Sequence, residues 1–205
     1  MSAVAAPPNS QSQLRRAVAT VAVLNLGYFG VEFTAATVIA SVSLFADSID
    51  FLEDAAVNLL ILAALAWSAR RRAMVGRLLA GLLLIPGLFT LWTAWQKYMT
   101  LAVPDPAVLS LAGVGALCIN LWCAYRLARF RNQGGSLTRA AWLSARNDAV
   151  ANIAIVLAGL MTAALASPWP DLVVGLGIFV LNVDAAQQVY AAARREHRDA
   201  SRSEA

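Results

Sequence analysis

Acidic side chains are concentrated where the sequence is otherwise apolar. Seven stand deep within apolar stretches, and four of them fall within eight residues: Glu32, Asp47, Asp50, Glu53, Asp54, Asp148 and Asp184. A carboxylate in the middle of a bilayer costs about 2.5–3.5 kcal/mol even on a lenient insertion scale. Arg146 is the one cation set against them at a similar depth. We therefore expect the acids to bind a cation, protons, or both.

Helical spacing puts three of the four clustered acids on one face. At about 100° per residue, Asp47, Asp50 and Asp54 fall within roughly 60° of one another on a helix over 43–67. Asp50 and Asp54 are four residues apart, which places their carboxylates close enough to share one ion. This face is the first half of a predicted cation site.

A later apolar stretch, 138–166, carries a similar polar strip. Ser144, Asp148 and Asn152 recur at intervals of four residues and so share one helix face. The two stretches are predicted to run in opposite directions through the membrane. The two strips can therefore meet near its middle and complete the site.

The other polar residues in these stretches have alternative roles. Asp47 is expected to cap or hydrogen-bond near the outer helix end rather than to ligate, and Glu32 is either a structural hydrogen-bonding residue or a proton carrier. Glu53 and Arg146 can pair with each other or extend toward the interface. Asp184 is expected to reach the cytoplasmic water or a nearby arginine. The buried amides are expected to join helices by hydrogen bonds: Asn25, Asn58, Asn120, Asn152 and Asn182.

Composition places these acids in a membrane protein. Of the 205 residues, 60% are hydrophobic and 14% are charged, and the mean hydropathy is +0.63. Soluble domains have about 45–50% apolar and about 25% charged residues. A globule of this size could not bury such an excess of apolar side chains. Disorder is excluded as well, because disordered chains are poor in hydrophobic residues.

Six apolar stretches approach the roughly 20 residues that a helix needs to cross a bilayer. They cover 15–38, 43–67, 76–99, 106–129, 138–166 and 170–192. Backbone polar groups must be paired within lipid, so helices are expected. The predicted fold is an all-α polytopic membrane protein with six transmembrane helices. This domain, 15–192, would lie between a disordered lead, 1–14, and a charged tail, 193–205.

Positive charges are distributed unevenly between the two sides. Fourteen arginines lie near the termini and in two of the connections, whereas the other three connections carry only Lys97. Both termini are therefore predicted to be cytoplasmic, in an inner or plasma membrane. This distribution explains the net charge of +4 without nucleic acid as a partner, and it is compatible with anionic lipid. Aromatic residues mark the opposite side: Trp92, Trp95, Tyr98 and Trp169.

The second stretch resembles the second-helix signature of the cation diffusion facilitator family. It reads Ser41-Val-Ser-Leu-Phe-Ala-Asp-Ser-Ile-Asp-Phe-Leu-Glu-Asp54. In that family a His or Asp, followed four residues later by an Asp, supplies half of a tetrahedral metal site. These positions match Asp50 and Asp54, so the resemblance implies that both are metal ligands.

The fifth stretch is similar to the other half of the family's site, in which a His or Asp precedes an Asp by four residues. Asp148 stands at the Asp position, and Ser144 departs from the family at the first position. The helix count and the cytoplasmic termini also agree, so the resemblance covers about 15–192. Members typically continue into a cytoplasmic ferredoxin-like domain that dimerises, whereas this chain stops soon after the sixth stretch. A homodimer is therefore left open.

These residues would form a site built of oxygen atoms. Three carboxylates and the Ser144 hydroxyl make an oxygen-only set, and Asn147 or a water would fill the fourth place because a hydroxyl is a weak ligand. Oxygen ligands favour harder ions such as Mn²⁺, whereas zinc usually takes some nitrogen or sulfur. The family mostly carries Zn²⁺, with relatives for Mn²⁺, Fe²⁺, Co²⁺ and Cd²⁺, so the resemblance implies Zn²⁺ first.

The implied function is efflux of a divalent metal by alternating access, in exchange for protons. Metal affinity falls when carboxylates are protonated, which gives the coupling directly. The metal and protons are substrates, with no resident cofactor and no enzymatic activity expected. Glu32, Asp47, Glu53 and Asn147 are the candidates for accessory or proton-coupling roles.

Three other functions compete with metal efflux. An intramembrane aspartyl protease could use Asp50 and Asp148, but the Gly-x-Gly-Asp context is absent and four clustered acids exceed a dyad. A membrane metal sensor or scaffold would bind the ion without transport. An organic-cation transporter would need a large aromatic-lined cavity beside the acids, whereas the surrounding residues are mostly small or aliphatic.

Overall fold

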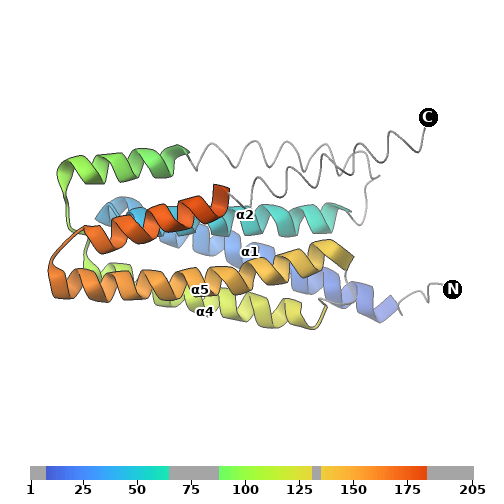
Figure 1. Ribbon diagram of the computed structural model, residues 1–205. Coiled ribbons are helices and arrows are strands. Elements are labelled where there is room, and N and C mark those ends of the chain that lie inside the picture. Colours follow the sequence, from blue (N-terminus) through green and yellow to red (C-terminus); the bar gives the residue numbers. More distant parts are fainter. Residues whose placement is uncertain (1–7, 65–87, 131–134, 184–205) are drawn as a thin grey trace, which may run out of the picture.

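The chain folds into a bundle of antiparallel helices (Figure 1). The computed structural model describes residues 8–64, 88–130 and 135–183, and this part of the chain contains six helical segments and no strand. The segments are α1 (Pro8–Ile39), α2 (Val42–Ala64), a helix over 88–100, α4 (Pro106–Ala128), α5 (Gly135–Leu165) and the helix Trp169–Val183. The predicted all-α class is confirmed.

Three of the described helices are long and apolar enough to cross a membrane. They are the Ser12–Ile39 part of α1, the whole of α4 and the Ala141–Leu165 part of α5. The central helix α2 carries four acids within its 23 residues, which lower its hydropathy. The acids that make α2 a candidate for cation binding are therefore the ones that make it less apolar.

The turns between helices gather at one end of the bundle. The connections 40–41, 101–105 and 166–168 lie there (Figure 1). By their sequence positions, Arg15, Arg16, Arg126 and Arg129 stand near the opposite ends of α1 and α4. We therefore name the end with the turns the outer end. Each of these turns begins with a residue in the left-handed region: Ala40 at φ 52°, Leu101 at φ 51° and Ala166 at φ 47°. A left-handed residue is the common way to end a helix, although glycine usually fills that position.

Two close helix pairs, α1 with α2 and α4 with α5, form most of the bundle. Glycines allow α4 and α5 to approach each other closely. A Cβ at Gly113 of α4 would lie 2.9 Å from the Ile155 side chain, and one at Gly159 of α5 would lie 3.0 Å from the Ser110 backbone nitrogen. Small residues of this kind let helix backbones pack together in membranes, where hydrophobic burial does not drive association.

The two larger clusters of buried apolar side chains are separated by polar residues. The outer cluster consists of Ala36, Leu44, Phe45, Ala46, Ile49, Leu109, Ile155 and Ile178. The inner cluster consists of Val18, Val21, Ile61, Cys123, Leu127, Ala141 and Ala145. The helix positions between them carry a polar layer: Asn25, Glu32, Asp47, Asp54, Asn120, Asp148 and Asn152. The fold therefore closes a band of acids and amides on both sides with hydrocarbon.

Some boundaries differ from those predicted. Helix α1 begins at Pro8, inside the lead that was expected to be disordered over 1–14, because proline is well accommodated in the first helical turn. Helix α5 begins at Gly135 rather than at residue 138. Asp184, the tail over 193–205 and parts of the third and sixth predicted spans lie outside the described residues.

Candidate metal centre

A serine hydroxyl links the two helices that were predicted to share a site. Ser144 Oγ of α5 donates to Asp54 Oδ1 of α2 at 2.9 Å, and it lies 3.4 Å from Asp148 Oδ2. Asn25 of α1 approaches the other Asp54 oxygen at 3.4 Å. Asp54 is buried, with 6% of its surface exposed. Carboxylates from α2 and α5 therefore converge on one hydroxyl inside the bundle.

Asp50 is held by a helix that was not expected to contribute. Its Oδ1 accepts a hydrogen bond from Asn182 Nδ2 of the helix Trp169–Val183. Asp50 is half-buried. It stands one helical turn before Asp54 on α2 and so lies beside the same group of acids, although a different neighbour holds it.

The acids share one region without forming a closed chelate. Within the described part of the chain, no three His, Cys, Asp or Glu side chains are close enough together to hold a metal ion. Like charges repel, and neutral donors are bonded to two of the carboxylates: Ser144 to Asp54 and Asn182 to Asp50. Side-chain movements would be needed to gather the carboxylate oxygens around one ion.

A second pair of acids lies on the outer side of this group. The Glu32 carboxyl of α1 and the Asp47 carboxyl of α2 are both fully buried. No described donor reaches either Glu32 oxygen. Asn152 Nδ2 donates to Asp47 Oδ2 at 2.7 Å, and Asn120 Nδ2 donates to Asn152 Oδ1 at 3.1 Å. A chain of two amides therefore ends on Asp47.

The remaining predicted accessory residues lie toward the edge of the bundle. Asn147 and Arg146 are exposed, and Arg146 donates to Asn147 Oδ1 at 3.3 Å while its guanidinium lies 5.6 Å from the centre of the Trp142 ring. Glu53 is half-buried on α2, next to Asp54. Among the described side chains, Arg146 contacts these partners rather than Glu53.

Comparison with known proteins identifies the family of the chain. A family model of the cation efflux transmembrane domain matches residues 18–193, which include every helix that carries these acids. The chain belongs to this family. No curated protein matched it. The chain is thus a multi-pass membrane protein for cation efflux, in a family of transporters rather than of enzymes.

Sequence reasoning missed a second buried charge site in this cation efflux protein, at its outer end. Lys97 Nζ lies 2.7 Å from Asp171 Oδ2 and donates to the Ala40 carbonyl at 2.7 Å. Asp171 also accepts four hydrogen bonds from the start of α2: Val42 N at 2.9 Å, Ser43 N at 3.1 Å, Ser41 Oγ at 2.6 Å and Ser43 Oγ at 2.6 Å. The signal was an acid just after the Pro-Trp-Pro turn and the single basic residue of the outer connections.

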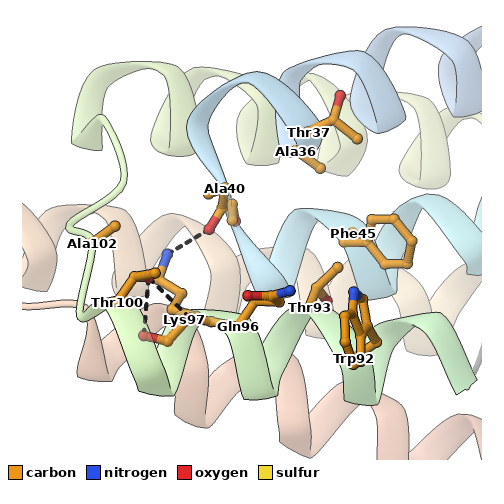
Figure 2. Close-up of a pocket in the computed structure, with 11 residues that line it drawn as sticks. Ala36, Thr37, Ala40, Phe45, Trp92, Thr93, Gln96, Lys97, Thr100 and Ala102 are labelled. Carbon is orange, nitrogen blue, oxygen red and sulfur yellow. Dashed lines mark hydrogen bonds between the residues drawn. The ribbon is translucent and has the colours of Figure 1, made fainter.

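We call the contacts of Asp171 with Lys97 and the start of α2 the outer junction. A hollow of 410 Å³ lies beside this junction rather than beside the acids of the polar layer. Figure 2 shows Lys97 reaching across it to the Ala40 carbonyl, with Phe45 and Trp92 on its walls. No lining residue is acidic. The hollow therefore lacks the counter-charge that an organic cation would require.

Proposed function

We propose that this cation efflux protein exports a divalent transition-metal ion in exchange for protons. Asp50, Asp54 and Asp148 would be the ligands, with Ser144 beside them. The observation that carries the proposal is the hydroxyl bridge from Ser144 to Asp54, with Asp148 Oδ2 3.4 Å from the same hydroxyl. It brings candidate oxygen ligands from two helices together inside the bundle.

The chemistry of these ligands limits the choice of ion. Carboxylate and hydroxyl oxygens bind Mn²⁺ well, and carboxylates also bind Zn²⁺ at about 2.0–2.2 Å. We propose Zn²⁺ as the cargo, with Mn²⁺ as the competitor that an oxygen-only set favours. Fe²⁺, Co²⁺ and Cd²⁺ belong in the same test.

Exchange for protons follows from the ligand type. A carboxylate must lose its proton to bind the metal, so protons arriving from the outer side would displace the ion. The buried carboxyls of Glu32 and Asp47 stand nearer the outer ends of α1 and α2 than the ligands do, and they would receive those protons. The outer and inner apolar clusters would open in turn, because each separates the polar layer from one side.

The test is transport by the purified protein in lipid vesicles that contain a pH-sensitive dye. Each metal is supplied in turn, and uptake of metal and movement of protons are recorded together. We expect Asp54→Ala and Asp148→Ala to abolish both signals. Asp105→Ala is the matched control, because Asp105 caps α4 outside the polar layer. Wild-type flux in either ligand variant would refute the ligand assignment, and metal binding without flux would favour a sensor or scaffold.

A further inference from the structure

The helix Trp169–Val183 runs alongside α2 in a fixed register. A Cβ at Gly175 would lie 2.7 Å from the Ser43 backbone nitrogen, so the two backbones are nearly in contact there. Seven residues further along each helix, Asn182 meets Asp50. Seven residues span about 10.5 Å of helix. The two contacts are therefore separated by the same distance along both helices, so the helices run parallel over this length.

The outer junction fixes this register. Asp171 stands one helical turn before Gly175 and accepts hydrogen bonds from the Val42 and Ser43 backbone nitrogens. These nitrogens belong to the first turn of α2, where backbone N–H groups have no partner within the helix. The Asp171 carboxylate therefore fixes the position of the start of α2 along the helix Trp169–Val183. As a result, Asn182 lies beside Asp50.

The amide of Asn182 can act as a donor or as a ligand. Its Nδ2 donates to Asp50 Oδ1, and a half-turn about the last side-chain bond would put its carbonyl oxygen in the same place. The two other candidates for a fourth ligand contact residues other than Asp50. Ser144 donates to Asp54, and Asn147 is exposed and accepts from Arg146.

We propose that Asn182 supplies the fourth oxygen ligand of the transported ion, next to Asp50. This inference rests on the proposed function, because it requires a metal at the carboxylates. An amide oxygen adds a ligand without adding charge, and it keeps the site free of nitrogen. Asn182 would therefore strengthen the competition of Mn²⁺ with Zn²⁺ for the site.

Substitutions of Asn182 separate a ligand from a residue that only joins helices. Asn182→Ala removes both functions. Asn182→Asp keeps an oxygen but cannot donate to Asp50, and it adds a negative charge. A ligand role predicts that Asn182→Ala weakens Mn²⁺ binding by about 10- to 100-fold, while Asn182→Asp binds Mn²⁺ at least as tightly as wild type. A purely structural role predicts that both variants bind Mn²⁺ weakly.

The measurement is calorimetric titration of the purified full chain with Mn²⁺ and with Zn²⁺ alone. Leu181→Ala is the control, because Leu181 is exposed one residue away on the same helix. Asn182→His should raise the ratio of Zn²⁺ affinity to Mn²⁺ affinity, since it replaces an oxygen by a nitrogen. If Asn182→Ala and Asn182→His keep the wild-type affinities while Asp54→Ala loses binding, the inference is wrong and the proposed function stands. If Asp54→Ala also binds as wild type does, the proposed function fails.

Discussion

The ion pair between Lys97 and Asp171 allows a quantitative test of how the outer end is held together. The two side chains are 1% and 0% exposed, and their charged atoms lie 2.7 Å apart. Removing one partner of a buried pair leaves an uncompensated charge, which typically lowers the free energy of unfolding by about 3–5 kcal/mol. Asp171→Asn leaves Lys97 with the Ala40 carbonyl as its described acceptor, so we expect a loss in this range.

The reciprocal change should be milder. Lys97→Met leaves the Asp171 carboxylate with four donors from the first turn of α2, and the positive end of a helix dipole stabilises a negative charge there. We expect a loss of about 1–3 kcal/mol for Lys97→Met. The double variant carries no unpaired charge, so its loss should be smaller than the sum of the two single losses by about 0.5–3 kcal/mol.

The assay is equilibrium unfolding of the four proteins in mixed detergent micelles, followed by circular dichroism. The difference between the double variant and the sum of the single variants measures the coupling of the two charges. A loss below 1 kcal/mol for Asp171→Asn would contradict this reasoning. So would losses that simply add, because the two side chains would then not interact.

Three further changes test other parts of the structure. Gly175→Val should destabilise the bundle by about 1–3 kcal/mol in the same unfolding assay, because its Cβ would lie 2.7 Å from the Ser43 nitrogen; unchanged stability would mean that these helices are not packed closely. Ala166→Gly should stabilise the protein by about 1 kcal/mol, because Ala166 has a φ of 47°; a lower thermal unfolding temperature would contradict the assigned turn. Ser144→His should raise Zn²⁺ affinity by on the order of tenfold by adding a nitrogen ligand, and weaker Zn²⁺ binding in calorimetry would place Ser144 outside the site.

Helical periodicity was sufficient to predict that the polar strip of α5 faces α2. Ser144 contacts both Asp54 and Asp148 because a spacing of four residues keeps side chains on one helix face, and this rule needs no tertiary information. The same reasoning could not predict which donor holds each acid. Ser144 reaches Asp54 across 90 residues of chain and Asn182 reaches Asp50 across 132, and such pairings depend on how the helices pack.

The outer junction was missed for a related reason. Asp171 lies beside α2 because the helix that carries it runs parallel to α2, a relation that no local pattern encodes. The turn before Asp171 and the lone outer lysine were visible in the sequence, but their partners were not. The start of α1 at Pro8 was missed for a different reason. A polar segment can extend an apolar helix into water.

The central claim is that oxygen atoms from α2 and α5 hold one divalent ion within the membrane. Its most direct test is an anomalous-difference map from crystals of the full chain grown with Zn²⁺ or Mn²⁺. We expect a peak with oxygens of Asp54 and Asp148 at about 2.0–2.2 Å. A peak located elsewhere, in a protein that still transports the ion, would contradict this account.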